Sequence, residues 1–286
     1  MINKPEMVNI LEHEGNNYKD LEDKIIILKF GGSVLNQILN SKIFLDDLKK
    51  IRELGVNIVI IHGGGKEISK YLSLLNINTQ FIDGLRVTDK KTMEIVEMVL
   101  SGKINKKIVS TFQVNGIDAI GLSGKDCGLI MAKKKLVKNK DLGFVGEVKY
   151  INKNLLKQFF KMSIIPVISP IGMDHSGITY NINADEVAVA IAKELGADKL
   201  IYLTDVDGVY VLIEGKEFLI PKIKADQAIY ILKNQLIKDG MIPKVKCCVK
   251  AVFNGIKEVC ILNGTNSHNL IKRIAYSQLI GTTFLK

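Results

Sequence analysis

The sequence contains no tryptophan, five prolines, four cysteines and only 6 % aromatic residues in 286 positions. The cysteines form no CxxC pair, and the adjacent Cys247 and Cys248 cannot form an unstrained disulfide, so we expect reduced thiols. No apolar run reaches the roughly 18 residues of a transmembrane helix, because Pro166 and Pro170 break the richest stretch, residues 164–171. The sequence therefore predicts a chain that needs neither disulfides nor a membrane.

Signals for export are also missing from residues 1–23, which carry both signs of charge and no apolar run. We expect the protein to work in the compartment where it is made. The net charge is +10, but the lysines are spread along the chain, and their densest run, residues 133–140, has no interleaved aromatic side chains. We interpret this run as a solvated hairpin and expect no nucleic-acid partner, although an anionic substrate would benefit from the charge.

The sequence does contain a repeated alternation of apolar runs, glycine turns and amphipathic segments. Residues 24–30 and 57–61 are continuous apolar runs, as in strands that are buried on both faces, and segments with helical spacing follow at 43–54 and 67–75. Further strands are predicted at 164–168, 199–203 and 258–262, hairpins at 125–149, and helices at 183–195, 225–238 and 243–254. This pattern predicts an α/β fold with a mainly parallel sheet that helices cover on both faces.

Two glycine-rich turns, Gly31-Gly32 and Gly63-Gly64-Gly65, end the two most apolar strands. Glycine lets the backbone approach an anion, and the helix start behind each turn offers free N–H groups. A tight turn without a ligand would be enough to explain a single glycine pair. Because glycine-rich turns follow both of these apolar strands, we favour anion binding. Known nucleotide signatures do not fit: residues 121–126 lack the first Walker A glycine, and the triglycine lacks the last glycine of GxGxxG.

Isolated polar residues stand at other predicted strand ends and helix starts. Lys29 precedes the first glycine turn, where its ammonium would face a phosphate, although a snorkelling surface lysine is the plainer alternative. Arg86 stands in a sequence that favours lysine, which indicates a bidentate grip on a carboxylate. The other candidates lie around the starts of two late helices: Asn181, Asn183, Asp185, Gly240 and Lys244.

Six segments carry more weight together than any one alone. They are Lys29-Phe-Gly-Gly-Ser33, His62-Gly-Gly-Gly65, Gly84-Leu-Arg-Val-Thr-Asp89, Tyr180-Asn-Ile-Asn-Ala-Asp185, Leu203-Thr-Asp-Val-Asp-Gly208 and Asp239-Gly-Met-Ile-Pro-Lys244. Together they resemble the acetylglutamate kinases of the amino-acid kinase superfamily, in order and spacing, over essentially all of residues 24–265. The resemblance implies a three-layer α/β/α sandwich. It also implies an N-terminal extension (1–23), an N-terminal lobe for N-acetylglutamate and dimerisation (24–178), and a C-terminal lobe for ATP (179–286).

The resemblance also implies transfer of the ATP γ-phosphoryl group to the γ-carboxylate of N-acetyl-L-glutamate, in arginine biosynthesis. The implied catalytic residues are Lys29, Lys244 and Asp185, with the aspartate orienting the two lysines. The implied substrate-binding residues are Gly64, Gly65, Arg86 and Asn181. ATP, which carries Mg²⁺ on its phosphates, would lie against Gly31, Gly32, Thr204, Asp205, Gly208, Tyr210 and Gly240. No protein ligand to a metal is implied.

Regulation and location stay less defined. Arg273, Ala275 and Leu279 depart from the signature of arginine-inhibited members, which leaves feedback inhibition open. The resemblance implies a homo-oligomer with a dimer core and leaves a hexamer open. Residues 241–248 are similar to the cyanobacterial and plastid branch, which predicts a plastid stroma, with a bacterial cytoplasm as the alternative. The similarity to that branch also makes a PII-type nitrogen signalling protein a candidate partner.

Two other functions stay open. An aminoadipate-type kinase or a glutamate 5-kinase is the nearest alternative, but Arg86 and the segment at Asn181 favour an N-acylated α-amino acid. An amino-acid-sensing protein without catalysis is the alternative of another class. Lys29, Asp185 and Lys244 argue against it, because a sensor has no need of two phosphate-facing lysines.

Overall fold

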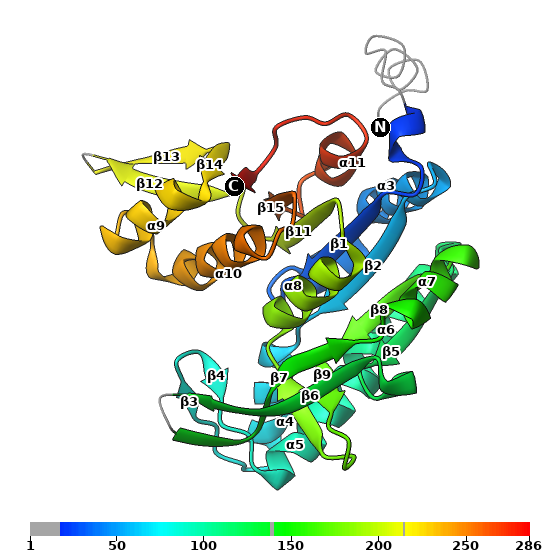
Figure 1. Ribbon diagram of the computed structural model, residues 1–286, viewed down its shortest axis with the longest axis vertical. Helices are drawn as coiled ribbons and strands as arrows, with labels where there is room; N and C mark the ends of the chain where they lie inside the picture. Colours follow the sequence, from blue (N-terminus) through cyan, green and yellow to red (C-terminus); the bar gives the residue numbers. More distant parts are fainter. Residues whose placement is uncertain (1–17, 138–139, 214) are drawn as a thin grey trace.

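The computed structural model describes residues 18–137, 140–213 and 215–286. Its centre is an eight-stranded sheet in the order β14-β16-β15-β11-β1-β2-β8-β5 (Figure 1). All neighbouring strands run parallel except β15 and β16, which confirms the predicted mainly parallel sheet. The strands are β1 (Ile25–Phe30), β2 (Asn57–His62), β5 (Ala119–Ser123), β8 (Ile165–Ser169), β11 (Lys199–Thr204), β14 (Lys222–Lys224), β15 (Glu258–Asn263) and β16 (Thr282–Leu285).

Helices cover both faces of this sheet, because alternate side chains of its central strands enter two separate apolar clusters. One face carries α2 (Leu35–Asn40), α3 (Lys42–Glu53), α4 (Gly65–Leu74), α5 (Lys90–Glu97), the π-helix η2 (Met98–Ile104), α6 (Asn105–Val114) and α11 (Asn269–Ile274). The other carries α7 (Lys153–Lys161), α8 (Ala184–Leu195), α9 (Ala225–Lys233) and α10 (Ile242–Phe253). The predicted α/β/α arrangement is confirmed.

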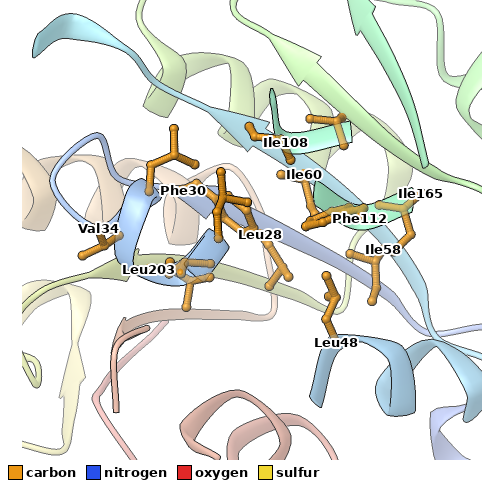
Figure 2. Close-up of a cluster of buried hydrophobic side chains, with 14 of the residues drawn as sticks. Leu28, Phe30, Val34, Leu48, Ile58, Ile60, Ile108, Phe112, Ile165 and Leu203 are labelled. Atoms are coloured by element: carbon orange, nitrogen blue, oxygen red, sulfur yellow. The ribbon is translucent and has the colours of Figure 1, made fainter. Parts of the chain in front are cut away.

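The first of these clusters anchors α6 to the sheet. Figure 2 shows Ile108 and Phe112 of α6 in one apolar group with side chains of β1 and β2, among them Leu28 and Ile60. All four side chains are fully buried. Each contributes roughly 1.5–3 kcal/mol by leaving water, so the cluster holds this helix firmly on the sheet.

Smaller strand groups flank the central sheet. β10 (Thr179–Ile182), β7 (Lys140–Ile151), β6 (Ile130–Val137) and β9 (Ile171–Met173) form a closed barrel. β12 (Val209–Ile213) pairs with β13 (Lys216–Ile220), and β3 (Phe81–Ile82) pairs with β4 (Leu85–Arg86). Short 3₁₀ turns lie at η1 (Tyr18–Leu21), η3 (Asp126–Gly128) and η4 (Asp239–Met241). The antiparallel pair β6–β7 confirms the predicted hairpin, in which Lys133 and Lys134 are exposed.

The predicted elements lie within a few residues of the observed ones, with informative exceptions. Asn183, which stands at the predicted helix start, is the N-cap of α8: its side chain accepts from the backbone N–H groups of Asp185 and Glu186. Glu186 does not complete a capping box, because its carboxylate pairs with Lys135 of β6. The predicted helix at 225–238 ends at Lys233. The long helical segment 90–114 was not predicted.

All four cysteines are free: Cys248 and Cys260 are buried, Cys247 is half-buried and Cys127 is exposed. No helix in the described ranges is long and apolar enough to span a lipid bilayer. Residues 1–17, most of the predicted N-terminal extension, lie outside the described residues.

Candidate active site

The two glycine turns lie side by side at the carboxyl edge of the sheet. β1 and β2 are neighbours, and their last residues, Phe30 and His62, stand opposite each other in the register. Ligands of open parallel sheets bind at this edge. The sequence-predicted turns therefore form one continuous, backbone-lined region.

The first turn follows β1 and needs glycine at one position only. The Gly31 N–H donates to the Leu203 carbonyl oxygen at 3.1 Å, and a β-carbon on Gly31 would stand 2.9 Å from that oxygen. No atom lies within 4 Å of a β-carbon built on Gly32. The backbone of Gly31 is thus pinned to β11, while Gly32 faces open space.

The second turn follows β2 and leads directly into α4, which begins at Gly65. Gly64 is the N-cap of this helix, and no side chain satisfies its first N–H groups. A β-carbon on Gly64 would stand 2.4 Å from Cδ1 of Ile104 and 2.6 Å from Cδ2 of Leu100. Apolar side chains therefore press on one side of the turn, and free helix N–H groups with a positive dipole end are left for an anion.

Lys29 and Asp185 form an ion pair beside the first turn. The Lys29 Nζ lies 2.6 Å from Asp185 Oδ1, and the two side chains are only 14 % and 18 % exposed. Lys29 comes from β1, and Asp185 from the first turn of α8, where Asn183 caps the helix. The aspartate therefore holds a largely buried ammonium group at the sheet edge, where a phosphate could approach it.

Lys244 lies in the first turn of α10, which packs against α8, the helix that carries Asp185 (Figure 1). Burial above all, and Asp185 after it, raise the pKa of the Cys247 thiol in the same helix to about 11, and Lys29 opposes this rise. Cys247 of α10 therefore lies near the Lys29–Asp185 pair. Asp185 pairs with Lys29, and no ion pair joins it to Lys244 in the described part of the chain.

A cavity of about 170 Å³ opens next to the second turn. All four predicted substrate-binding residues line it: Gly64, Gly65, Arg86 and Asn181. The Asn181 amide donates to Thr88 Oγ1 at 3.2 Å, which fixes the orientation of its side chain. The structure thus brings together residues from α4, β4 and β10 that lie up to about a hundred positions apart.

Arg86 is the cationic group of this cavity, and it is only 6 % exposed. Its Nη2 donates to the Gly65 carbonyl at 3.0 Å and to Ser69 Oγ at 2.8 Å, and its guanidinium stacks 4.7 Å above the Phe81 ring. Burial lowers its pKa, but an arginine stays charged at neutral pH. Its Nη1 is buried and has no hydrogen-bond partner among the described residues, so an anionic ligand could supply the missing acceptor.

The residues predicted for the nucleotide pocket follow β11 and precede α10. Thr204 is buried, and its Oγ1 accepts from the Val206 N–H at 3.0 Å. Gly208 packs against Thr282, where a β-carbon would stand 2.5 Å from Oγ1. Asp205 and Gly240 are exposed and Tyr210 is half-buried. Thr204 and Gly208 shape the loop, whereas Asp205, Tyr210 and Gly240 are accessible to a ligand.

Asp207 is a polar centre of this loop that the sequence analysis did not single out. Its Oδ1 accepts from the side-chain amides of Asn263 and Asn266, both at 2.9 Å, and its Oδ2 from Tyr210 OH at 3.4 Å. These bonds join the loop after β11 to the loop after β15. The sequence signal that could have indicated this role is the second aspartate of the segment Thr204–Gly208, which is Asp207 itself.

A larger hollow of about 530 Å³ touches both glycine turns, at Gly32 and Gly64. Four lysines line it: Lys66, Lys70, Lys103 and Lys107. Lys103 pairs with Glu67 at 2.9 Å, and this hydrogen bond lowers the Glu67 pKa. Sequence reasoning missed this positive region because its lysines come from three helical elements, α4, η2 and α6, of which the last two were not predicted. Among the described residues, no group of three His, Cys, Asp or Glu side chains is placed to hold a metal ion.

Comparison with known proteins adds the family. The sequence model of the amino acid kinase family matches residues 24–263. Acetylglutamate kinase from Clostridium acetobutylicum is 48 % identical over 255 residues, 88 % of this chain and 86 % of that protein. The crystal structure of smu.665 from Streptococcus mutans has 33 % identity and a TM-score of 0.77 over 91 % of this chain and 98 % of that one.

N-acetylglutamate synthase from Neisseria gonorrhoeae, solved with coenzyme A and N-acetyl-glutamate, superposes with a TM-score of 0.82. The match covers 94 % of this chain and 61 % of that one at 19 % identity, so it shows a shared fold alone. The family match and the 48 % identity to a whole relative carry further. The chain belongs to the amino acid kinase family and, within it, to the acetylglutamate kinases.

Proposed function

We propose that the chain transfers the γ-phosphoryl group of ATP to the γ-carboxylate of N-acetyl-L-glutamate, giving N-acetyl-L-glutamyl 5-phosphate and ADP, in arginine biosynthesis. One observation carries the proposal. The Lys29–Asp185 pair, two glycine turns and a cavity with an unpaired Arg86 nitrogen meet at one edge of the sheet. Such a site suits the joining of two anions.

The chemistry needs charge and position more than it needs a base. The acceptor carboxylate has a reference pKa of about 4.3, so it is ionised at neutral pH. One of its oxygens attacks the γ-phosphorus while the bond to the β–γ bridging oxygen breaks, and ADP leaves with that electron pair. The obstacle is repulsion between the carboxylate and the polyphosphate, so positioning and electrostatic stabilisation supply most of the catalysis.

The residues divide these tasks. Lys29, which Asp185 holds in place, and Lys244 would neutralise the phosphoryl group in transfer from two sides. The turn at Gly31 and Gly32 would hold the ATP phosphates, with the Gly32 N–H as the donor because that of Gly31 already bonds Leu203. The N–H groups of Gly64 and Gly65 would bind the acceptor carboxylate. Magnesium belongs to the substrate, because Mg²⁺ keeps most of its waters and binds phosphate oxygens of ATP.

Arg86 and Asn181 would bind the rest of the acceptor. Nη1 of Arg86 is buried without a hydrogen-bond partner among the described residues, and both Arg86 and Asn181 line the same cavity. A carboxylate on the acceptor would complete its hydrogen bonding and its charge. This requirement favours an acceptor with a second carboxylate besides the one that reacts.

The proposal extends to the lobes and the surroundings of the chain. Residues 24–178 would form the acceptor lobe with the dimer contact, and residues 179–286 the ATP lobe. A hexamer and a PII-type partner stay predictions that rest on the resemblance. Of the two compartments, the bacterial cytoplasm has the better support, because the curated relative compared above comes from a bacterium; the plastid alternative rests only on residues 241–248.

A hydroxamate assay with ATP and four acceptors in parallel tests the activity. We expect product with N-acetyl-L-glutamate and little with glutamate, aspartate or aminoadipate. Equal or greater product with glutamate or aminoadipate would replace the proposal by a related kinase. No product with any acceptor, from a folded protein that binds an amino acid, would favour the sensor.

We further expect no inhibition by arginine. Arg273 stands where arginine-inhibited relatives have a glutamate, and it is only 3 % exposed. Its Nη2 pairs with Glu258 and donates to Thr283 Oγ1 at 2.8 Å, so this guanidinium already uses the local carboxylate. An unchanged hydroxamate rate at millimolar arginine is the expected result, and a falling rate would contradict it.

A further inference from the structure

A fully buried histidine stands directly before the second glycine turn. His62, the last residue of β2, is 0 % exposed. Its Nδ1 lies 3.0 Å from the Gly63 carbonyl oxygen, and its Nε2 lies 3.2 Å from the side-chain Nδ2 of Asn105. Since a carbonyl only accepts and an amide NH₂ only donates, the proton sits on Nδ1 and Nε2 accepts. The ring is thus a neutral bridge between the turn and Asn105.

Asn105 is the first residue of α6 and is 1 % exposed. Its Nδ2 lies 2.9 Å from the Val167 carbonyl of β8 and 3.4 Å from the Leu122 carbonyl of β5. These two carbonyls require an NH₂ group in this position, which supports the assigned orientation of the amide. Asn105 therefore links His62 to two further strands at the same edge of the sheet.

The opposite side of the Asn105 amide is tightly enclosed. Among the described residues its Oδ1 is buried without a partner, and a β-carbon on Gly121 of β5 would stand 1.9 Å from it. The Gly121 backbone does not need a left-handed conformation, and the other close atom, Lys106 Nζ at 2.9 Å, ends a flexible side chain, so the requirement for glycine comes mainly from Asn105. A side chain introduced at position 121 would therefore displace Asn105 without any change to Asn105 itself.

A π-helix delivers these contacts. Residues 98–104 form η2 between α5 and α6, and π-helical turns are rare and frequently occur at functional sites. Leu100 and Ile104 of this segment press on Gly64, and Ser101 Oγ lies 2.9 Å from Ser169 Oγ at the end of β8. One irregular helical segment therefore supports the turn from its apolar side and presents Asn105 to His62.

We propose that His62 and Asn105 are positioning residues of the acceptor site, which set the backbone of Gly63–Gly65 through the bonds Asn105–His62 and His62–Gly63. The proposal rests on the proposed function, because it assigns this turn to the acceptor. Neither side chain lines the acceptor cavity, so both act through the turn. Their loss should weaken acceptor binding and leave the nucleotide side, where the first turn is pinned to Leu203, nearly unchanged.

Steady-state kinetics of two variants test this, after wild-type turnover of N-acetylglutamate has been measured to establish the proposed function. Asn105→Ala removes the bridge, and Gly121→Ala displaces it by steric contact. For each we expect the KM for N-acetylglutamate to rise on the order of 10-fold or more, with the KM for ATP within about twofold, because small displacements cost large factors in a positioned site. Asn115→Ala is the matched control, since Asn115 is the C-cap of this helix and its side chain donates to the Thr111 carbonyl, at the other end of the helix from His62.

Equal changes in both KM values, or an unchanged acceptor KM in a folded Asn105→Ala, would overturn the proposal. A third measurement needs no variant, in case neither folds. In ¹⁵N NMR of the wild-type histidines, His62 should show a proton on Nδ1, no titration between pH 6 and 9, and a shift on adding N-acetylglutamate that ADP does not cause. A proton on Nε2, or a His62 resonance that does not shift when N-acetylglutamate is added, would overturn the proposal. Wild type without turnover would instead refute the proposed function.

Discussion

The two glycine turns stand opposite each other in the sheet, yet the protein supports them in different ways. The turn after β1 is held by backbone bonds, from the Gly31 N–H to Leu203 and from the Val34 N–H to Gly31, and Gly32 faces open space. The turn after β2 is enclosed: Leu100 and Ile104 press on Gly64, and the neutral His62 bonds the Gly63 carbonyl. The first turn is therefore open on its ligand side, whereas packed side chains support the second turn.

This difference fits the two proposed ligands. A nucleotide brings its own Mg²⁺ and several phosphate oxygens, so many contacts can place it, with Lys29 and Lys244 as the proposed cations. The acceptor offers one reacting carboxylate, whose position relative to the γ-phosphorus decides the rate. A stiff turn beside the cavity and an adaptable turn beside the cations would serve that reaction.

The largest effect should come from the cations beside the first turn. Lys29→Ala or Lys244→Ala should lower kcat on the order of 100- to 1000-fold, because each would remove a preorganised charge from the transition state. Lys24→Ala is the control, since Lys24 lies before the same strand and its side chain is 45 % exposed beside Asp198. Near-normal turnover in a folded Lys29→Ala would remove the catalytic assignment and, with it, the role of the first turn.

Gly64→Ala should have the next largest effect. The new methyl group would stand 2.4 Å and 2.6 Å from the buried Ile104 and Leu100, so the turn or the π-helix must move. Overpacking of this kind costs about 1–3 kcal/mol. Urea unfolding and acceptor kinetics should both show the change. An unchanged free energy of unfolding would mean that the second turn is less firmly supported than we infer from comparing the two turns.

Acid should destabilise the protein through His62. Burial lowers the pKa of this histidine from 6.5 to about 4, so between these values the unfolded chain binds a proton that the folded chain refuses. Stability is therefore lost as the pH falls below 6.5, and the loss levels off below 4, at about 3 kcal/mol. Urea unfolding of wild type and His62→Gln at pH 7.5, 5.5 and 4.5 isolates the contribution of His62. The difference between the free energies of unfolding of the two proteins should become smaller as the pH falls. A constant difference would mean that the ring is not buried as a neutral group.

Gly32→Ala should have the smallest effect on stability. No atom lies within 4 Å of the new β-carbon, so the free energy of unfolding should stay within about 0.5 kcal/mol of wild type. A raised KM for ATP without a stability change would show that the open side of the first turn receives the phosphates. A stability loss as large as that of Gly64→Ala would erase the contrast between the turns.

Much of the sheet could be predicted because its signals are local. The apolar runs 24–30 and 57–61, with glycine after each, correspond to β1 and β2 with their turns. Asn183 caps α8 through bonds two and three residues away, again a local pattern. The segment 90–114 escaped prediction because three helical parts of different pitch interrupt any single apolar period.

The candidate site divides in the same way. The residue types at the sheet edge could be read from motifs: a lysine before a glycine turn, a lone arginine, an asparagine-rich helix start. The contact of Asp185 with Lys29 was expected only from the resemblance. The unpaired nitrogen of Arg86 and the lysine-lined hollow could not be predicted, because each depends on which distant segments meet.

The sequence by itself determined the strands, the glycine turns and the chemistry that can stand at their ends, since hydrophobic period and glycine conformation act over a few residues. The tertiary structure alone decided that His62 is neutral and bonds Asn105, 43 positions away, and that Asn105 bonds Val167, a further 62 positions on. Protonation and hydrogen bonding depend on the burial and partners of each group, and these exist only once the sheet has brought its strands together.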